Sequence, residues 1–248
     1  MPQSLVSTAI PPSDNASIRA MFDRIARRYD LFNLLTSLGM DTRWRAQALA
    51  FVDPGMHVLD LGCGTGDLTF GAARRAGVGG RVTGLDLSPV MLEVARTRAT
   101  RSSGPSAPIT WLEGRAEDVS SHGVRYDAVV SGFVLRNIRA HMDTVLTSLR
   151  AAAKPGAPIV LLDFTEPTGR MRRALWRAYM DRIVPLYGRL LFGADFPEGY
   201  MSASAACFDK PEQFAAKLRD AGFDGVSYRL FMMGSIVLYS ARNPGRVG

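Results

Sequence analysis

The sequence predicts an α/β protein built on a doubly wound, mostly parallel sheet of seven strands, and three observations support this prediction. Five strand-like apolar runs alternate with helical patterns between residues 56 and 165, which is typical of parallel strands joined by crossover helices. The first run, residues 58–61, leads into a turn with three alternating glycines. Two further strand-like segments, residues 226–230 and 235–240, predict a closing antiparallel pair.

The glycine turn predicts a ligand site. Glycine has no Cβ, so the backbone at Gly62, Gly64 and Gly66 lets a ligand approach closely, and the first amides of the following helix are free to bond it. Such a turn at the carboxyl end of a parallel strand usually holds a nucleotide-like cofactor. The dinucleotide fingerprint has its third glycine where this chain has Asp67, so a dinucleotide is not indicated.

Two acidic residues narrow the choice of cofactor. Asp60 closes the first predicted strand, and Asp86 closes the second, where a carboxylate is a natural partner for ribose hydroxyls. Two such acids around a tight glycine turn resemble the class I S-adenosylmethionine-dependent methyltransferases, whose fold is Rossmann-like. The resemblance implies S-adenosyl-L-methionine as the cofactor, held by Asp60, Gly62, Gly64, Thr65, Gly66, Asp86, Arg115, Ala116 and Ser131.

Length and composition agree with a cytoplasmic enzyme. At 248 residues and 47% hydrophobic, the chain is long enough to bury a full core as one domain with additions. Its two cysteines form no disulfide framework, no apolar run reaches the roughly eighteen residues of a membrane span, and the N-terminus lacks a signal-peptide pattern. The net charge of +7 permits attraction to an anionic membrane surface or to nucleic acid, without choosing between them.

We expect a single methyltransferase domain over residues 1–248, divided into five segments. Apolar positions spaced by three and four from Ile18 to Tyr29 predict one amphipathic helix, capped by Asp14, Asn15 or Ser17, and a second helix follows over 44–51. The segments are a loose tail (1–16), a helical lid over the crevice (17–51), the cofactor-binding core (56–165), a helical insertion on the substrate side (168–208), and the last helix with the closing strand pair (211–241).

The residue types of the predicted lid resemble those of one family. Residues 21–33 (MFDRIARRYDLFN), residues 37–41 (SLGMD) and Trp44-Arg45 are similar to the opening signature of the ubiquinone/menaquinone biosynthesis C-methyltransferases. After the fourth predicted strand, residues 133–137 (FVLRN) resemble that family's Phe-Gly-Leu-Arg-Asn motif. The resemblance spans about residues 20–241. It implies C-methylation of a polyprenylated quinol ring, either demethylmenaquinol to menaquinol or the corresponding benzoquinol.

Four positions depart from the family pattern, and one of them is Asp163, a shortened acid where the family commonly has glutamate. Val134 replaces the glycine of the motif, and because valine adopts positive φ only at a cost, we expect the loop to be shaped differently. Arg115 stands where the family usually has Asn or Asp against the adenine, so backbone groups, Glu117 or Asp118 are alternatives for that contact. Glu198 stands where the family has a tyrosine two residues before the position of Tyr200.

The catalytic residues predicted for such a reaction are Arg136, Asn137 and Tyr200. A quinol carbon becomes a good nucleophile when a neighbouring hydroxyl ionises, and Arg136 is permanently cationic, so we assign it to stabilising the phenolate. Asn137 and Tyr200 are expected to orient the ring, and Tyr29 or Asp30 to close the site from the lid. The alternative for the first two is a solvated arginine and a helix-capping asparagine.

No general base stands out for the ring proton. His141 begins a helix near Asn137 and is one candidate, and water is another. No group of His, Cys, Asp and Glu has the spacing of metal ligands, so no metal is predicted.

The insertion predicts either a membrane-surface helix or an ordinary helix pair packed on the core. Its arginines interleave with aromatic and aliphatic residues, which is the composition of a helix lying on a bilayer. The expected partner is a prenylated quinol. Peripheral contact of the protein with the inner face of the membrane is left open. A homodimer or a biosynthetic complex is also left open.

Three other functions remain as alternatives. A nucleic-acid methyltransferase would suit the basic charge, but the Asn/Asp-Pro-Pro-aromatic motif of amino-methylating members is missing after the fourth predicted strand, so no nucleic acid partner is expected. A non-catalytic cofactor-binding scaffold would bind S-adenosyl-L-methionine without turnover. The third alternative is a methyltransferase of the same fold acting on another phenolic or prenylated small molecule.

Overall fold

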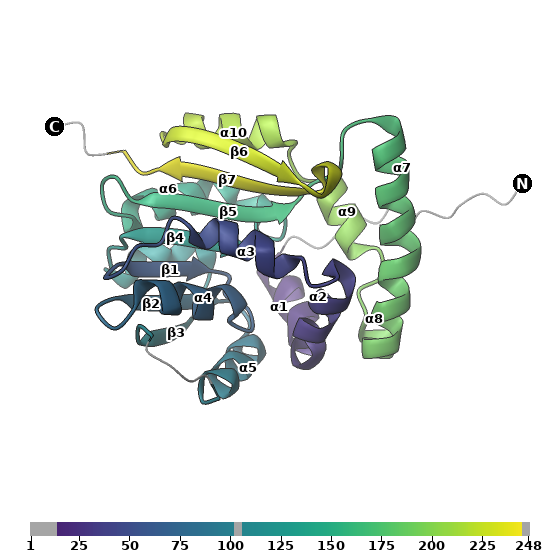
Figure 1. Ribbon diagram of the computed structural model, residues 1–248, viewed down its shortest axis with the longest axis horizontal. Helices are drawn as coiled ribbons and strands as arrows, with labels where there is room; N and C mark the ends of the chain where they lie inside the picture. The colour runs from purple at the N-terminus through teal and green to yellow at the C-terminus, as the bar shows by residue number, and fades with distance from the viewer. Residues whose placement is uncertain (1–13, 102–105, 245–248) are drawn as a thin grey trace, which may run out of the picture.

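Figure 1 shows the protein as a computed structural model, which describes residues 14–101 and 106–244. A seven-stranded sheet runs through it in the order β3-β2-β1-β4-β5-β7-β6. Strands β1 to β5 pair in parallel, whereas β7 runs antiparallel to both β5 and β6, so the predicted α/β fold with its closing antiparallel pair is confirmed. The strands are β1 (His57–Leu61), β2 (Arg81–Asp86), β3 (Ile109–Glu113), β4 (Ala128–Gly132), β5 (Pro158–Phe164), β6 (Asp224–Phe231) and β7 (Ile236–Arg242).

Helices cover both faces of the sheet and one of its ends. Those packed along the sheet are α3 (Asp41–Leu49), α4 (Asp67–Ala76), α5 (Pro89–Ala99), α6 (Met142–Ala152) and α10 (Pro211–Asp220). Ser88 caps α5 as its sequence suggests, because its Oγ accepts a hydrogen bond from the Met91 amide at 3.0 Å.

The central strands of the sheet are buried on both faces. Along β5, Ile159 and Leu161 belong to one apolar cluster and Val160 and Leu162 to another. The first cluster includes side chains of α6 and α10, and the second includes side chains of α3 and α4. This explains why the central strands read as continuous apolar runs rather than as an alternating pattern.

The predicted lid consists of three helices, α1 (Asn15–Ile25), α2 (Tyr29–Ser37) and α3. The predicted tail, 1–16, is too long at its end, because Asp14 caps α1 and Asn15 and Ala16 already belong to this helix. Residues 1–13 lie outside the described residues. The prediction of one continuous helix from Ile18 to Tyr29 is wrong, because a 3₁₀ turn at Ala26–Arg28 separates α1 from α2. The apolar spacing continues through this turn, so the sequence pattern gives no sign of the break.

The predicted insertion forms helices stacked along one side of the molecule (Figure 1). They are α7 (Arg170–Ala178), a π-helical turn (Tyr179–Ile183), α8 (Val184–Phe192) and α9 (Tyr200–Ala206). Trp176, Met180 and Val184 bury their side chains together with Phe32 of α2. The insertion therefore packs against the lid as well as against the end of the sheet.

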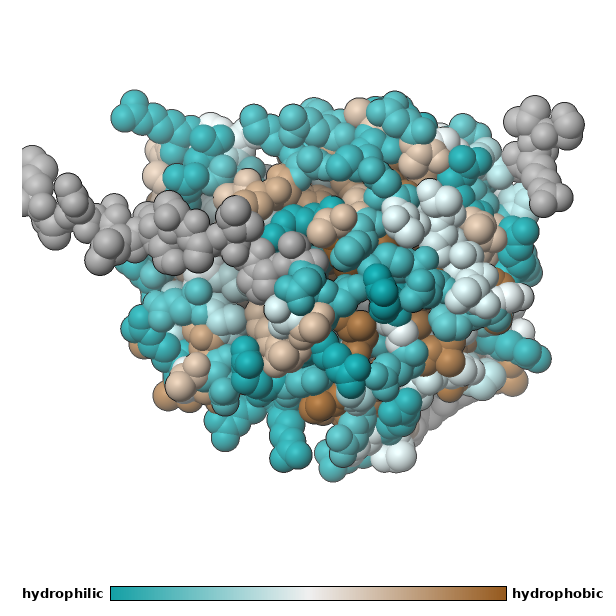
Figure 2. Space-filling view, turned by 180° about the vertical axis from the view of Figure 1, so that it is seen from behind, coloured by the Kyte–Doolittle hydropathy of each residue, from teal (hydrophilic) through white to brown (hydrophobic). Residues whose placement is uncertain are grey.

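The rear face of the molecule, relative to the view of Figure 1, is mostly polar. Figure 2, which shows the protein from behind, has hydrophilic side chains over most of its area and hydrophobic ones in small patches near the centre and lower edge. Within residues 14–101 and 106–244, no helix is both long enough and apolar enough to cross a membrane.

Candidate functional site

The loop between β1 and α4 forms a cradle of backbone groups. Its glycines Gly62, Gly64 and Gly66 have φ of 69°, 52° and 93°. A Cβ at Gly62 would lie 2.3 Å from the side chain of Val134, so a larger residue does not fit unless Val134 moves. The sequence therefore needs glycine here for its backbone conformation and for the close approach of a neighbouring loop.

Asp86 braces this loop from the end of β2. Its Oδ2 accepts a hydrogen bond from the Gly64 amide at 2.7 Å, and its Oδ1 accepts one from the Ser88 amide at 2.8 Å. Burial raises the pKa of Asp86, although these hydrogen bonds oppose the rise.

A cavity of about 80 Å³ lies beside the loop, and we call it the glycine-loop cavity. Five of the nine predicted cofactor residues line it: Gly62, Gly64, Asp86, Arg115 and Ala116. Apolar side chains supply much of the remaining wall, among them Ile18, Leu85, Leu87, Met91, Val134 and Ile138. Glycine backbone next to a carboxylate and an apolar slot suits a nucleoside with a polar chain.

Three more of the predicted residues shape the loop from outside this cavity. Ser131 donates from Oγ to the Leu61 carbonyl at 2.7 Å and so joins β4 to β1. Thr65 donates from Oγ1 to Asp30 of the lid. Gly66 is the N-cap of α4. Direct cofactor contact by these three stays a prediction.

Asp60, the ninth predicted residue, is buried beneath the loop. Only 1% of the residue is exposed, and its Oδ2 accepts a hydrogen bond from Thr69 Oγ1 at 2.5 Å. Its Oδ1 has no hydrogen-bond partner among the described residues. Burial raises the pKa of Asp60 to about 7, against the effect of the Thr69 hydrogen bond.

Glu117 is a lining residue with an unused acceptor atom. Its Oε1 accepts hydrogen bonds from Asn15 Nδ2 at 3.0 Å and from Arg115 Nη2 at 2.9 Å. Its Oε2 is buried without a partner among the described residues. Burial opposes ionisation of Glu117, but the hydrogen bonds outweigh it and lower its pKa. The sequence named Glu117 only as a substitute for Arg115, whose own side chain is half exposed and turned to Glu117.

Polar contacts fasten the lid to the carboxyl edge of the sheet. Asp30, in the first turn of α2, accepts from Thr65 and pairs with Arg98 at 2.8 Å. Asp23 of α1 accepts a hydrogen bond from Ser88 Oγ. Because Thr65 and Ser88 flank the glycine loop and β2, α1 and α2 are attached directly to the elements around the glycine-loop cavity.

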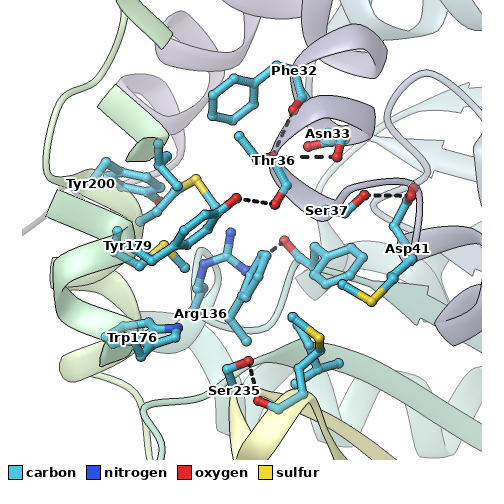
Figure 3. A pocket seen from close by; sticks show the side chains of 18 of the residues that line it. Phe32, Asn33, Thr36, Ser37, Asp41, Arg136, Trp176, Tyr179, Tyr200 and Ser235 are labelled. Atoms are coloured by element: carbon cyan, nitrogen blue, oxygen red, sulfur yellow. Dashed lines mark hydrogen bonds between the residues drawn. The ribbon is translucent and has the colours of Figure 1, made fainter. Parts of the chain in front are cut away.

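A second and larger cavity, which we call the lid cavity, has a volume of about 350 Å³. The lid, the insertion, the loops after β4 and β5 and the turn between β6 and β7 all contribute to it. Most of its wall is apolar or aromatic, with Phe32, Phe133, Phe164, Trp176, Met180 and Phe192 among the lining residues. Figure 3 shows Arg136 near the middle of this cavity, with Trp176 and Tyr179 on one side and Asp41 on the other.

Arg136 is held by Asp163 of β5. Its guanidinium pairs with Asp163 Oδ1, its backbone amide donates to Asp163 Oδ2 at 3.1 Å, and its Cζ lies 4.8 Å from the ring centre of Phe164. Its Nε is buried without a partner among the described residues. The alternative of a solvated arginine is therefore wrong, because Arg136 is only 4% exposed and is paired. The sequence noted Asp163 only as a shortened acid.

The loop that carries Arg136 has its positive φ one residue earlier than the family motif suggests. Phe133 has φ of 64°, whereas Val134 is not among the described residues with positive φ. Val134 therefore needs no strained backbone, and its side chain packs on Gly62 instead. An aromatic residue in this region of φ is uncommon and is found mostly at functional sites.

Asn137 and Tyr200 are joined by a hydrogen bond between the two cavities. Tyr200 Oη donates to Asn137 Oδ1 at 2.8 Å, and both side chains are buried. Asn137 lines the glycine-loop cavity and Tyr200 lines the lid cavity. Burial raises the pKa of Tyr200, and the charge of Arg136 opposes the rise. The predicted catalytic residues thus meet where the cavities adjoin.

Tyr29 and Phe22 line both cavities. Burial raises the pKa of the Tyr29 hydroxyl, with nearby Arg136 and a hydrogen bond to Asn33 acting in the opposite direction. Tyr29 was expected to close the site from the lid, whereas nothing in the sequence marked Phe22 as a site residue. An apolar residue on the inner face of an amphipathic helix looks the same whether it packs on a core or lines a ligand site.

His141 does not lie on either cavity wall. Its Nε2 is 3.8 Å from Glu117 Oε1, and its side chain is 36% exposed. The residues described by the structure include no group of three or more His, Cys, Asp and Glu placed to hold a metal ion.

Comparison with known proteins gives consistent matches. The sequence model of the ubiE/COQ5 methyltransferase family matches residues 12–242. A demethylmenaquinone methyltransferase from Lactiplantibacillus plantarum is 34% identical over 223 residues, covering 88% of this chain and 92% of that protein. A ubiquinone/menaquinone biosynthesis C-methyltransferase UbiE from Pseudomonas syringae pv. tomato is 32% identical over 238 residues, covering 95% of this chain and 92% of that protein.

Solved structures share the fold at lower identity. Magnesium protoporphyrin IX methyltransferase from Synechocystis, with bound SAH, superposes with a TM-score of 0.66 at 19% identity and covers 92% of this chain and 99% of its own. A possible histamine N-methyltransferase from Thermotoga maritima gives a TM-score of 0.59 at 16% identity, covering 91% and 99%. These two proteins have the class I methyltransferase architecture described above.

Proposed function

The chain belongs to the ubiE/COQ5 methyltransferase family, and on that basis we propose that it methylates a ring carbon of a prenylated quinol in quinone biosynthesis. It is an S-adenosyl-L-methionine-dependent methyltransferase. The substrate we propose is demethylmenaquinol or the corresponding benzoquinol. The observation that carries the proposal is the pair of adjoining cavities, one beside the glycine loop and Asp86 and one mostly apolar around a buried arginine.

The glycine-loop cavity fits the cofactor. Asp86 offers carboxylate oxygens for ribose hydroxyls, Gly62 and Gly64 line the same space without side chains that would block a ligand, and Glu117 Oε2 is an unused acceptor suited to the adenine amino group. When bound, S-adenosyl-L-methionine supplies an electrophilic methyl group on its sulfonium sulfur. Val134 and Asn137 line the same cavity beside the lid cavity and would position that end of the ligand.

The lid cavity fits a quinol ring with an apolar chain. Arg136 is its buried cation, and hydrogen bonds to described residues occupy Nη1, which leaves Nη2 for an ionised ring hydroxyl. Asp163 fixes the position of the guanidinium and moderates its charge, so a phenolate is stabilised by a group that needs no rearrangement. Tyr200 and Asn137 orient the ring, and the lid, residues 17–51, excludes water.

Ring methylation of a quinol is the test. Purified protein is incubated with S-adenosyl-L-methionine and either a reduced short-chain demethylmenaquinol or a demethoxy-type benzoquinol, and the products are analysed by mass spectrometry with fragmentation. We expect one added methyl group on carbon with at least one quinol. Tight SAH binding without methylation of either quinol would contradict the proposal and favour the scaffold or another phenolic substrate.

We also propose that the enzyme works at the membrane surface as a peripheral protein. A polyprenyl chain is insoluble in water, so the substrate resides in a bilayer, and the basic net charge of +7 favours approach to anionic lipids. Homodimerisation or membership of a biosynthetic complex stays a prediction.

A further inference from the structure

The exposed large apolar side chains gather around the lid cavity. Among the described residues twelve such side chains are exposed, and eleven of them lie in three segments, 31–38, 171–190 and 230–233. These segments belong to the lid, to the insertion and to the turn between β6 and β7, and each contributes to the wall of the lid cavity. The twelfth is Val78, in the turn between α4 and β2. Such clustering marks an interaction surface rather than scattered surface residues.

Four of these side chains line the lid cavity while remaining exposed, and we call them the apolar rim. They are Leu38, Leu175, Met232 and Met233, with exposed fractions of 75%, 56%, 42% and 62%. The rim is therefore continuous with the interior of the cavity. An apolar molecule at the rim therefore contacts the wall of the same cavity that contains Arg136.

Three of the four rim residues have a backbone conformation that disfavours them. Leu38, Met232 and Met233 have φ of 52°, 49° and 54°, and Phe133 is the one other non-glycine residue with positive φ among those described. Glycine or asparagine adopts this conformation at lower cost. Leu38 and Met233 are 75% and 62% exposed, so packing does not repay the strain at these two residues.

Charge indicates what kind of surface the rim meets. Between residues 166 and 189 the chain has six arginines and two acidic residues. Glu166, one of the two acids, is already paired with Arg173 and Arg177. Arg170 and Arg172 are exposed, and no ion pair with another described residue involves them. Unpaired arginines beside exposed leucine and methionine complement an anionic headgroup layer above an acyl-chain interior.

We propose that the apolar rim inserts into the interface of a bilayer containing anionic lipid, with Arg170 and Arg172 on the headgroups, so that the lid cavity opens toward the acyl chains. This inference rests on the proposed function, because a prenylated substrate gives the docking its purpose. It assigns the contact to three segments distant in sequence rather than to the insertion alone. It also predicts which end of the molecule faces the membrane.

Binding to vesicles that contain no quinol tests the docking separately from the reaction. The full chain is co-sedimented with vesicles of phosphatidylcholine alone or with added phosphatidylglycerol, and we expect stronger binding to the anionic vesicles. The variant Leu38→Asn/Met233→Asn should lose roughly tenfold or more in vesicle partitioning for each side chain removed from the interface. The same variant should have a higher Tm, because asparagine tolerates positive φ.

Matched variants separate the effect of the rim on vesicle binding from the effects of general surface hydrophobicity and of charge. Val78→Asn removes a side chain that is 76% exposed but lies away from the cavity, and should bind vesicles like the wild type. Arg170→Gln/Arg172→Gln should reduce the preference for anionic vesicles. Equal binding by the rim variant and the wild type, an equal loss in Val78→Asn, or no wild-type binding to either vesicle would each overturn the proposal. Methylation of a dissolved short-chain quinol tests the proposed function independently of these results.

Discussion

At the scale of single residues, the site depends on buried charges whose partners come from other strands. Arg136 follows β4 and Asp163 lies in β5, and the two are neighbours because β4 and β5 pair in parallel. Among the described residues no cation pairs with Asp60, which is held by the Thr69 hydroxyl instead. Arg136 and Asp60 therefore lead to separate predictions.

Removing Arg136 should separate its catalytic role from its structural one. Arg136→Gln leaves Asp163 buried without its cation, so we expect a loss of about 3–5 kcal/mol in the free energy of unfolding and a fall in methylation of about 100-fold or more. In Arg136→Gln/Asp163→Asn no buried charge is left unpaired, and most of the stability should return without the activity. Chemical unfolding and kcat/KM measure the two effects. Full activity in the stable double variant would show that Arg136 does not act on the substrate.

Asp60 should make stability fall as pH rises. Its pKa is about 7 in the folded protein and close to the ordinary value near 3.8 in the unfolded chain, so the folded state holds the proton more tightly. The resulting stabilisation is complete below about pH 4 and is lost as pH rises through 7; it should shrink by about 2 kcal/mol between pH 5 and pH 7. Urea unfolding at several pH values measures it.

The matched variant for this effect is Asp60→Asn. Its amide oxygen still accepts the Thr69 hydrogen bond, but the side chain does not titrate. The difference in unfolding free energy between wild type and variant should therefore decline from pH 5 to pH 7. A constant difference would show that Asp60 ionises in the folded protein at its ordinary pKa.

At the scale of elements, the lid is where sequence and structure differ most. The apolar spacing correctly predicted an amphipathic helix and which of its faces is buried. It did not reveal the 3₁₀ turn after which the chain begins a separate helix at Tyr29. The loop after β4 shows a related limit. The sequence predicted that Val134 would give the loop a different shape, but it did not indicate that Phe133 would take the positive φ, because which residue of a loop does so depends on what packs against its neighbours.

Weakening the contacts of Asp30 with Thr65 and Arg98 should loosen the lid without unfolding the sheet. Asp30→Asn weakens the pairing with Arg98 and alters the contact with Thr65, so we expect faster dissociation of SAH and faster hydrogen exchange of the amides of α2. Asp143→Asn, at an exposed position in the first turn of α6, is the control and should change neither. Unchanged SAH dissociation in Asp30→Asn would mean that the lid does not retain the cofactor.

At the scale of the whole molecule, the sequence predicted the fold well and the site in part. Alternating strands and helices suffice to predict parallel strands whose carboxyl ends share an edge, which brought Asp86 and Arg136 to one side. In the sheet, β7 lies between β5 and β6, and in the site Tyr200 is hydrogen-bonded to Asn137. Both arrangements depend on contacts between distant parts of the chain. No local pattern encodes such contacts.

The two cavities share part of their wall, because Phe22 and Tyr29 belong to both. An occupant of one cavity therefore contacts two side chains that also line the other, so we expect the exchange of the two ligands to be coupled. If both proposed ligands bind, we predict an ordered release, in which the methylated quinol leaves first and the spent nucleoside follows once the common wall is free to move.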